Sequence, residues 1–595
     1  MEAEGPRLRK SLTLLDVFML GVTGMIGSAW LFSVLGAAGA MGPSAIFSWI
    51  IAGVFFIVMV FGFAELGGLF PFSGSLARYN HYTHGTISNY LLAWTYFIGS
   101  VTTVSSEAVA VVEYSSAYIP WAWNSKLDLL TPLGVAVAAG IVLLFFAVQL
   151  IGVHVYGWLN RFLTAWKLII PTLTFILIFL MYFKPENITK VPGGLFPFGT
   201  AAVFSGLITT GIVYAYEGFR QGLEYAGETK NPQRDVPLGT ILALAVVIAI
   251  YVLLQIAFIG GINWSKAGVS FGNWTALSSA WQAHPFYSEL TAAGIPLLAA
   301  FAVLLLIDAI VSPAGTLGAY IGTTARNLYG MARVNYIPKF FGDIHKGFRT
   351  PWIALIVSTI IAIIFLLPFP TWYAIMSLSA TATVYNYLTV GVTNHALRRL
   401  SPSLRRPYRP PAWYIVYPLS FIMAALFIYW SSWTYVNVII ELAVIGLPLL
   451  LLGPYRNELN LTRARSAEFS AIYWAASAAT IAAYWLKLSR MSLTGFAIYW
   501  GLLSSIQVLS LAALWMLSKG HGDVKGAVWL IAFNIGIGII SFIGSLGPLP
   551  SPLIPYPWDY VAAAVFSLGV YFLGVYTSYK TKDLAEVELH GLRAE

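Results

Sequence analysis

Cysteine is absent from this sequence, and charged side chains are scarce in it. Without cysteine the chain has no disulfide, no thiolate metal site and no cysteine nucleophile. Only 10% of the 595 residues are Asp, Glu, Lys or Arg, whereas soluble domains carry about 25%. A water-soluble chain of this length would need more polar surface to cover itself. The shortage of charge therefore argues against a string of soluble domains and favours a membrane protein.

Enzyme motifs are missing as well. The sequence has no histidine motif with metal-binding spacing, no glycine-rich phosphate loop followed by Lys and Ser or Thr, and no serine nucleophile elbow between a strand and a helix. A membrane enzyme should gather acidic, His or Arg residues in one loop, but the charges of the densest cluster, Leu397 to Arg409, are all basic. We therefore expect no enzymatic activity, no catalytic residue, no metal, no other cofactor and no ATP-driven step.

Long hydrophobic runs fill most of the chain, of which 58% is hydrophobic. Many runs exceed the roughly 18 residues that mark a membrane-spanning helix. The 21 Trp and 33 Tyr residues suit side chains at headgroup depth. We predict sixteen spans, at residues 12–40, 44–70, 88–120, 130–152, 156–183, 200–229, 237–262, 294–332, 351–369, 371–397, 412–432, 434–453, 467–487, 494–518, 525–547 and 558–579.

The net charge of +9 comes from Lys and Arg residues in short loops between the apolar runs. In a soluble protein this charge would suggest nucleic acid as a partner, but here it predicts topology. With the N-terminus in the cytoplasm, the inner side receives most of the basic residues: Arg7, Arg9, Lys10, Arg78, Arg161, Lys230, Arg234, Arg333, Lys339, Lys346, Arg349, Arg398, Arg399, Arg405, Arg406, Arg409, Arg456, Arg463, Arg465, Lys519, Lys525, Lys580 and Lys582. The outer side receives Lys126, Lys184, Lys190, Lys266, Lys487 and Arg490. We expect a multi-pass protein of the cell membrane with both termini in the cytoplasm and no nucleic-acid partner.

One predicted outer loop, Asn263 to Ala293, is long and contains Trp264, Trp274 and Trp281. A loop of this length is commonly functional or packed as a cap. The alternative is a solvent-facing connector, and the sequence leaves both interpretations open.

Two spans contain residues that break membrane helices. The first holds Gly21-Val22-Thr23-Gly24-Met25-Ile26-Gly27-Ser28-Ala29, and the sixth holds Tyr214-Ala215-Tyr216-Glu217-Gly218-Phe219-Arg220. Irregular backbone at membrane depth is tolerated only beside a cavity or inside protein, and charges beside a glycine there must face a polar site. Because the spans lie five apart, two inverted five-span repeats would bring both breaks together, as in secondary transporters. The alternative for each glycine patch is close helix packing.

These residues resemble the amino acid–polyamine–organocation (APC) superfamily of transporters. The first-span break of that family is similar to Gly24 through Ser28, and its sixth-span break is similar to Tyr214 through Phe219. The more specific signals are Glu228 to Pro237 after the sixth span, and Arg326 to Arg333, Ile337-Pro338 and Thr350-Pro351 after the eighth. The resemblance covers roughly residues 10 to 455, and we recognise no counterpart for the last four spans.

The resemblance implies an all-α membrane fold whose core is an inverted five-helix repeat (5+5), with broken helices 1 and 6 and additional C-terminal spans. It divides the chain into a cytoplasmic N-terminus (1–11), a transport core of ten spans (12–397), spans 11 and 12 (398–455), four extra spans (456–579) and a cytoplasmic tail (580–595).

The resemblance also implies a substrate site at the two breaks. Free N–H groups at the start of a half-helix suit a carboxylate, and unwound carbonyls suit an ammonium group. We expect the substrate carboxylate to bind beside Gly24, at Met25, Ile26, Gly27 and Ser28. We expect the substrate amine to bind beside Glu217 and Gly218, at Tyr214, Ala215 and Tyr216.

The sequence departs from the family at three positions near these breaks. Ala29 stands where the family usually has a third glycine, and Trp30 stands where it has a small aliphatic residue, so both would narrow the pocket. Arg220 stands where the family often has an acidic residue, and Glu217 precedes the glycine instead. The two charges either pair with each other, or Arg220 engages an anionic group of the substrate.

Among the ionisable residues inside the predicted spans, three more are candidates for function. Lys167 resembles the lysine that takes the place of sodium in this family, and a buried lysine can exchange protons, which favours proton coupling. The alternative is a lysine that snorkels to the cytoplasmic interface. Glu107 and Asp308 are candidates to bind a cationic side chain or carry a proton, and the alternative is structural pairing.

The sequence therefore predicts a secondary active transporter that moves amino acids or related small amines across a lipid bilayer by alternating access, coupled to protons. The alternatives are an amino acid/polyamine exchanger, a channel and a non-transporting membrane sensor. A channel would need rings of repeated filter residues, and none is visible in the sequence.

Overall fold

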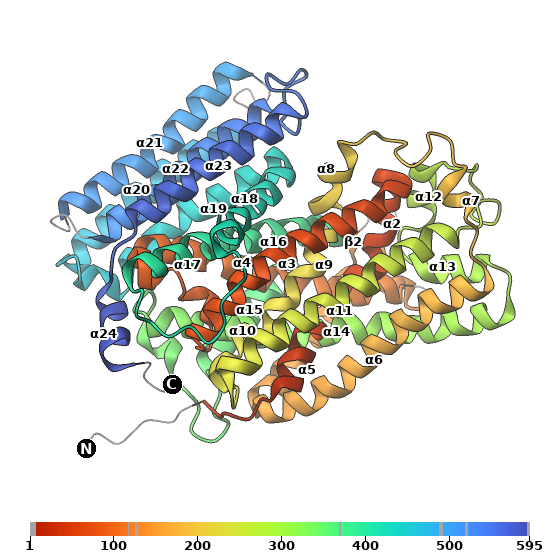
Figure 1. Cartoon of the computed structure of the whole chain (residues 1–595), viewed down its shortest axis with the longest axis horizontal. Helices are drawn as coiled ribbons and strands as arrows, with labels where there is room; N and C mark the ends of the chain where they lie inside the picture. The colour runs from red at the N-terminus through yellow and green to blue at the C-terminus, as the bar shows by residue number, and fades with distance from the viewer. Residues whose placement is uncertain are drawn as a thin grey trace. The chain divides into compact units, whose positions relative to one another are not determined.

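The computed structural model describes residues 8–116, 118–124, 129–367, 371–486, 492–517 and 522–591. Regular structure in these residues is α-helical or 3-10, apart from one short antiparallel pair in which β1 (Trp123–Asn124) meets β2 (Leu129–Leu130). Figure 1 shows the succession of helices along the chain. Of the charges used to predict topology, Arg7, Lys126, Lys487, Arg490 and Lys519 lie outside the described residues.

The chain divides into two compact units, and each takes residues from several parts of the sequence. The first consists of Met1–Val60, Gly99–Ala325 and Ile344–Ala380, and the second of Phe61–Ile98, Arg326–Asp343 and Thr381–Glu595. Four helices have residues in both units: α3 (Ala45–Leu69), α4 (His81–Ser115), α14 (Pro296–Arg333) and α16 (Trp372–Tyr387).

Helices of the first unit pack closely because small residues line their contacts. Its remaining long helices are α1 (Leu14–Met25), α2 (Ala29–Met41), α5 (Pro132–Ile151), α6 (Val153–Met181), α11 (Pro232–Gly260) and α15 (Trp352–Ile364). Helix α1 contacts both α6 and α11. A Cβ atom on Gly21 would lie 2.8 Å from the Cβ of Ala243, so glycine sets the approach of α1 to α11.

The predicted outer loop of residues 263–293 is a packed cap of the first unit. It contains α12 (Trp274–Trp281) and α13 (Pro285–Ala292), and both helices contact α2. Trp264, Trp274 and Trp281 are all buried. Phe286 of α13 packs on Trp30 of α2, with ring centroids 5.4 Å apart. The interpretation of this loop as a solvent-facing connector is therefore wrong.

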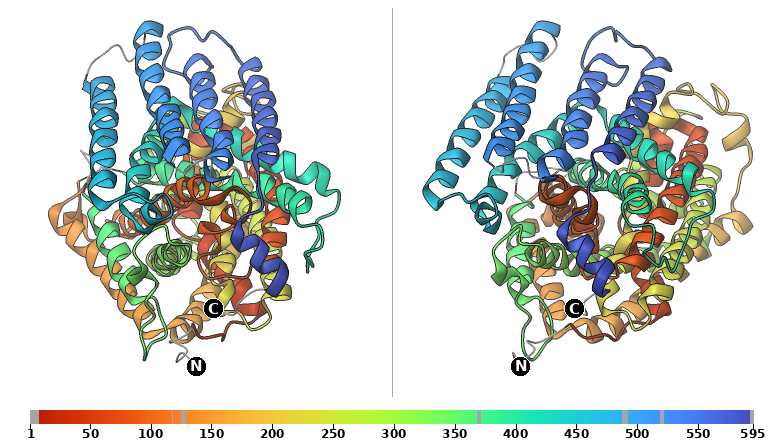
Figure 2. Two further views of the ribbon diagram at one scale, coloured as in Figure 1. Left: turned by 90° about the vertical axis from the view of Figure 1, so that its left-hand side faces the viewer. Right: turned by 60° about the vertical axis from the view of Figure 1, so that its left-hand side comes forward.

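The second unit holds the C-terminal helices. They are α17 (Thr389–Leu400), α18 (Trp413–Trp430), α19 (Ser432–Leu452), α20 (Arg463–Leu486), α21 (Leu493–Leu517), α22 (Gly522–Ile543), α23 (Trp558–Thr577) and α24 (Lys582–His590). Figure 2 shows α20 to α23 side by side, and each contacts the next along the chain. Helix α23 also packs on α17 and α18, so the predicted extra spans are built into this unit.

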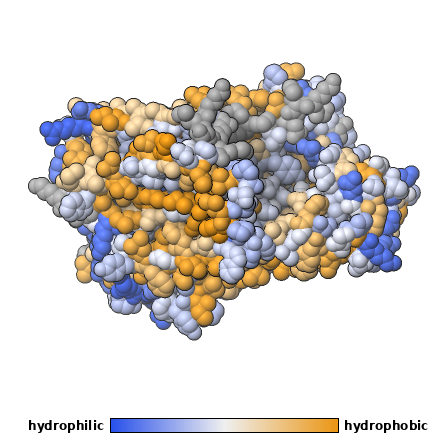
Figure 3. Space-filling view, turned by 90° about the horizontal axis from the view of Figure 1, so that it is seen from above, coloured by the Kyte–Doolittle hydropathy of each residue, from blue (hydrophilic) through white to orange (hydrophobic). Residues whose placement is uncertain are grey.

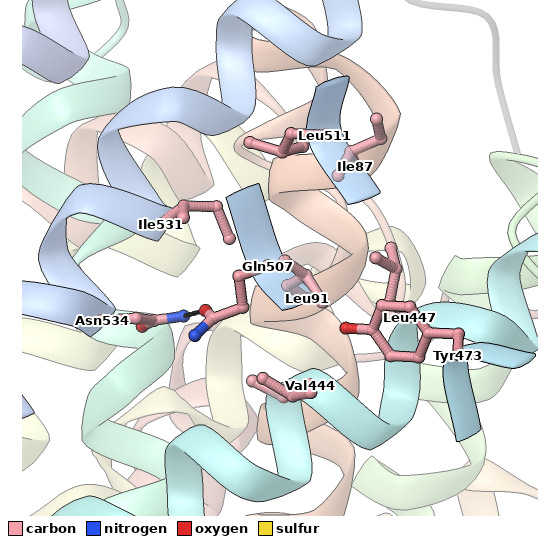
Figure 4. A pocket seen from close by; sticks show the side chains of 10 residues that line it. Ile87, Leu91, Val444, Leu447, Tyr473, Gln507, Leu511, Ile531 and Asn534 are labelled. Atoms are coloured by element: carbon pink, nitrogen blue, oxygen red, sulfur yellow. Dashed lines mark hydrogen bonds between the residues drawn. The ribbon is translucent and has the colours of Figure 1, made fainter. Parts of the chain in front are cut away.

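The interior of the second unit is close-packed. A cavity of about 10 Å³ lies among α4, α19, α20, α21 and α22, lined mostly by aliphatic side chains. That volume holds at most about one water molecule. Figure 4 shows the amides of Gln507 and Asn534 turned toward each other at its edge, where the Asn534 amide donates to Gln507 Oε1 at 3.1 Å. This polar pair is satisfied within the protein.

Eleven helical segments among the described residues are long and apolar enough to cross a membrane. Every one of the sixteen predicted spans coincides with helical structure, but several are short or broken, so the number of crossings stays a prediction. Broad apolar areas cover the face seen in Figure 3, and large apolar side chains such as Leu144, Phe162 and Leu180 are exposed on α5 and α6. Such a surface suits lipid as solvent.

Two predicted spans are interrupted in the structure. Helix α4 begins at His81, seven residues before the predicted start, but Gly85 interrupts it with a φ of 74°, so its uninterrupted part begins close to the predicted residue 88. The tenth predicted span is split into α16 and α17 at Leu388. The predicted division of the chain at residues 397, 455 and 579 stays a prediction.

Candidate functional site

The first span is broken where the glycine pattern predicts. Helix α1 ends at Met25 and α2 begins at Ala29, with residues 26–28 outside both helices. The α-helix cannot continue through Ile26, because this residue has a non-helical ψ of 81°. This interruption leaves the first N–H groups of α2 and the last carbonyls of α1 to find partners elsewhere.

The sixth span is also broken, and only one of its two interruptions, at Gly218–Arg220, lies within the predicted segment. It consists of α8 (Ala202–Thr209), α9 (Ile212–Glu217), a 3-10 turn (Gly218–Arg220) and α10 (Gln221–Glu224). The predicted unwound residues Tyr214, Ala215 and Tyr216 are helical. The interruptions flank them, since Gly211 takes a φ of 90° that glycine adopts at little cost. The expectation that these three residues are unwound is therefore wrong, and their binding of the substrate amine stays a prediction.

The two interruptions lie directly against each other. A Cβ atom on Gly218 would lie 2.0 Å from the carbonyl carbon of Gly24 and 2.3 Å from the nitrogen of Met25. A Cβ atom on Gly24 would lie 2.7 Å from the carbonyl oxygen of Gly218. Backbone meets backbone at this point, so both positions require glycine. The two breaks predicted from the sequence therefore lie in segments that contact each other in the first unit.

Glu107 of α4 joins the two broken spans. Its carboxylate accepts hydrogen bonds from the Ser28 N–H at 2.8 Å, the Ser28 hydroxyl at 2.8 Å and the Tyr214 hydroxyl at 2.8 Å. Trp372 Nε1 donates to the Ser28 hydroxyl oxygen at 2.8 Å. The Glu107 carboxylate therefore accepts the hydrogen bond of the Ser28 N–H, which we expect to bind the substrate carboxylate. The N–H groups of Ile26 and Gly27 bond to the Val22 and Met25 carbonyls, and the binding of a substrate carboxylate at the first break stays a prediction.

Gly27 leaves room for this carboxylate. A Cβ atom there would lie 2.6 Å from Thr316 Oγ1 and 2.8 Å from Glu107 Oε2. The Gly27 N–H donates to the Met25 carbonyl at 3.0 Å, and the same carbonyl accepts from the Tyr251 hydroxyl at 2.5 Å. The polar backbone of the break is thus satisfied by side chains of α4, α11 and α14.

Lys167 is fully buried beneath the break. Its ammonium donates to the Thr23 carbonyl at 3.0 Å and to Thr316 Oγ1 at 2.8 Å, and Thr316 in turn donates to the same carbonyl at 2.7 Å. The ammonium therefore sits on the last turn of α1, where the helix dipole favours a positive charge. The alternative in which Lys167 snorkels to an interface does not fit this position.

Asp308 of α14 is buried in the same unit. The Ser312 hydroxyl donates to Asp308 Oδ1 at 2.9 Å. Lys167 interacts electrostatically with both Asp308 and Glu107. One buried cation and two buried carboxylates therefore lie within range of electrostatic interaction in the first unit.

Glu217 and Arg220 lie together beside the second break, and both are fully buried. Arg220 donates to the Glu217 carbonyl at 2.9 Å, and its Nη1 lies 3.9 Å from Glu217 Oε2. The guanidinium also lies over the Tyr320 ring, 5.0 Å from its centroid. Of the two roles that the sequence left open, the structure places Arg220 in a pair with Glu217.

Sequence reasoning missed several residues of this site, among them Thr23, Ser106, Tyr251, Thr316 and Trp372. Thr316 had a signal, because it follows a run of small residues and a proline in the middle of a span, and a Cβ on its neighbour Gly315 would lie 2.9 Å from Lys167 Cε. Tyr216 lies elsewhere, since its hydroxyl donates to the Trp49 carbonyl at 3.2 Å. The described residues contain no group of three or more histidine and acidic side chains placed to hold a metal ion.

Comparison with known proteins now identifies the family. Residues 12–449 match the family described as amino acid permease. The chain belongs to the amino acid permeases of the APC superfamily. This membership confirms the resemblance drawn from the glycine breaks and the motifs after spans 6 and 8, and it makes the chain a multi-pass membrane protein.

Individual relatives extend the match to the end of the permease. The glutamate/serine transporter AimA of Bacillus subtilis is 32% identical and covers 98% of this chain and 96% of its own length. The aspartate-proton symporter of the same organism is 29% identical and covers 96% of each chain. The methylthioribose transporter of Bacillus subtilis is 26% identical and covers 69% of this chain and 86% of its own length. The four C-terminal helices, for which sequence reasoning found no counterpart, are thus shared with the first two relatives.

Proposed function

We propose that the permease is a secondary active transporter that moves amino acids across the cell membrane by alternating access, driven by protons. The observation that carries this proposal is the contact of the two helix breaks at Gly24 and Gly218, with Glu107 hydrogen-bonded across them. Broken helices that meet at a polar, buried point are the substrate sites of inverted-repeat transporters. The inverted 5+5 repeat, the sixteen spans and the cytoplasmic termini are part of the same proposal.

Glu107 links proton binding to substrate binding in this proposal. An ionised carboxylate holds the Ser28 N–H and hydroxyl firmly, because charge-assisted hydrogen bonds are stronger than neutral ones. Protonation removes that charge and releases both donors. The carboxylate of an amino acid can then bind at the N-terminus of α2, where N–H groups and the helix dipole favour an anion. Proton and substrate therefore bind together.

In the same mechanism, Lys167 stabilises the conformation of the first break before substrate binds. While protonated, it ties α6 to α1 through the Thr23 carbonyl and Thr316. Loss of its proton weakens that tie and frees the first break to change conformation. A buried lysine suits this role because burial disfavours its charged form. Asp308 is the second carboxylate that can stabilise the ammonium.

The substrate class that we propose is an amino acid with an acidic or small polar side chain. Support comes from the names of two full-length relatives, one a glutamate/serine transporter and the other an aspartate-proton symporter. Arg220 adds chemical support, since it is a buried guanidinium beside the second break. In this proposal a side-chain carboxylate of the substrate competes with Glu217 for Arg220.

Uptake into proteoliposomes that contain the full-length permease tests this function. Labelled aspartate, glutamate, serine and spermidine are offered under an inward proton gradient, an inward sodium gradient or neither. We expect aspartate, glutamate or serine to accumulate under the proton gradient and not under the sodium gradient. Uptake that requires unlabelled amino acid inside the vesicles would replace the proposal with an exchanger, and no uptake by folded protein would contradict transport altogether.

A further inference from the structure

A basic pocket lies in the second unit, apart from the helix breaks. It has a volume of about 320 Å³ and lies at the end of α17, the connecting segment of residues 401–412 and the first turn of α18. Four arginines line it, together with His395 and Trp413: Arg398, Arg399, Arg406 and Arg409. The proposed transport mechanism uses none of these arginines.

Two of the arginines form a fixed inner wall. Glu65 accepts from Arg398 Nη2 at 2.9 Å and from the Tyr417 hydroxyl, and Arg406 Nε forms an ion pair with Glu65 Oε1 at 3.1 Å. Arg406 further donates to the Leu404 carbonyl at 3.0 Å. One carboxylate thus serves two guanidinium groups, which leaves this wall with an excess of positive charge.

The other two arginines are exposed at the mouth of the pocket. Arg399 donates to the carbonyl of Ser578 at 2.9 Å and to its hydroxyl at 2.8 Å, and neither group neutralises its charge. Within the described part of the chain, Arg409 has no carboxylate at ion-pair distance. The nearby Glu588 is already engaged by Lys580 and Ser403. The pocket therefore collects four positive charges against the one negative charge of Glu65.

The neighbouring surface indicates where such an anion comes from. On α18, Tyr414 is 65% exposed and Ile415 is 49% exposed, directly after Trp413 of the pocket. On α23, which contacts both α17 and α18, Phe572 and Tyr576 are also exposed. Trp and Tyr gather where a membrane protein meets lipid headgroups. The basic pocket thus opens beside apolar side chains that acyl chains can cover.

We propose that this pocket binds the phosphate group of an anionic membrane lipid. Guanidinium groups bind phosphate oxygens through paired hydrogen bonds, and basic pockets between membrane helices on the cytoplasmic side hold anionic headgroups. The lipid phosphate lies between Arg399 and Arg409 above the Arg398–Glu65–Arg406 wall, and the acyl chains run along Tyr414 and Ile415. Under the predicted topology the lipid belongs to the cytoplasmic leaflet.

Thermal unfolding and native mass spectrometry of the purified full-length permease test this site. The probes are phosphatidylglycerol, phosphatidylcholine and inorganic phosphate. We expect phosphatidylglycerol, and not phosphatidylcholine, to raise the unfolding midpoint and to remain bound in the mass spectrum. The variant Arg399→Gln/Arg409→Gln should bind phosphatidylglycerol with an affinity that is lower by about tenfold or more. Each of the two substitutions removes a charge-assisted contact with the lipid phosphate.

The matched control is Arg405→Gln, which removes an exposed arginine of the same segment that does not line the pocket. It should bind phosphatidylglycerol like the unmodified permease. The single variant Arg409→Gln guards against misfolding, because it also leaves the hydrogen bonds of Arg399 to Ser578 intact. Equal binding by Arg405→Gln and the double variant would overturn the site. Equal stabilisation by inorganic phosphate alone would overturn the lipid assignment and make the pocket a site for soluble phosphate.

Discussion

The burial of Glu107 shows how a charge is kept inside the permease. Removing a carboxylate from water costs several kcal/mol unless hydrogen bonds and an opposite charge replace the water. Three donors from Ser28 and Tyr214 contact it, and the Lys167 ammonium interacts with it electrostatically. These partners come from the first break, α9 and α6, so the charge holds three segments in one arrangement. Removing the charge should therefore change conformation as well as binding.

The substitution Glu107→Gln tests the coupling role of this carboxylate. Glutamine keeps the shape but is a weaker acceptor and cannot bind a proton. We expect proton-driven accumulation to fall by at least about tenfold, since hydrogen bonds to charged groups contribute about 1.5–3 kcal/mol. Uptake measured in the proteoliposome assay checks this, with Glu441→Gln, a buried glutamate of the second unit, as control. Unchanged dependence on the proton gradient would remove Glu107 from the coupling mechanism.

The substitution Lys167→Met keeps much of the side-chain volume and removes the ammonium. We expect uptake to lose its dependence on external pH, because no charged form remains to support the Thr23 carbonyl and Thr316. Initial uptake rates across a pH series measure the effect. Lys184→Met, a lysine outside the buried site whose ammonium contacts the Tyr182 hydroxyl, should keep the ordinary profile. A pH profile shared by both variants would show that Lys167 is structural.

Single helices explain which parts of the site could be predicted. The first break was placed correctly because three glycines and a serine are concentrated within residues 21–28. The sixth span was predicted as broken, yet its interruptions fall on either side of α9, since no local pattern tells which glycine takes the left-handed conformation of Gly211. Partners of the breaks, such as Tyr251 and Trp372, come from distant helices and carry no local signal.

The contact between the two broken spans can be tested at Gly218. In the variant Gly218→Ala the added Cβ would lie 2.0 Å from the Gly24 carbonyl carbon, so the 3-10 turn and α1 must move apart. We expect a loss of about 1–3 kcal/mol in the free energy of unfolding, typical of overpacking, and loss of transport. Gly140→Ala on α5 is the control, because nothing lies within 4 Å of that position. A normal unfolding midpoint for Gly218→Ala would contradict the contact.

The C-terminal helices are part of the permease rather than an appendage. The family match ends at residue 449, but two relatives match almost the whole chain. Contacts within the second unit explain this, since α23 packs on α17 and α18 and the His84 imidazole hydrogen-bonds to the Gly574 carbonyl at 2.9 Å. Sequence reasoning could find these four helices by hydropathy, but their partners are hundreds of residues away. Only the folded chain reveals that α4 and α23 share a core.

Asp523 is the residue at which these distant segments meet. Its carboxylate accepts from the Thr86 N–H at 3.1 Å, from the Tyr455 hydroxyl at 2.9 Å and from the Tyr579 hydroxyl. It lies in the first turn of α22, where the helix dipole favours a negative charge. A Cβ atom on Gly85 would lie 1.9 Å from Asp523 Oδ1, so the interruption of α4 at that glycine makes room for it.

The substitution Asp523→Ala should therefore loosen the whole second unit. Three donors lose their acceptor, and each unsatisfied buried group costs about 1–3 kcal/mol. We expect a clearly lower midpoint of thermal unfolding for the full-length permease in detergent, together with lower yield. Lys525→Ala, two residues along α22 and exposed, should unfold like the unmodified protein. If the two variants unfold at the same temperature, α22 and α23 do not stabilise α4 through Asp523, and the shared C-terminal helices must owe their retention to a contact other than this one.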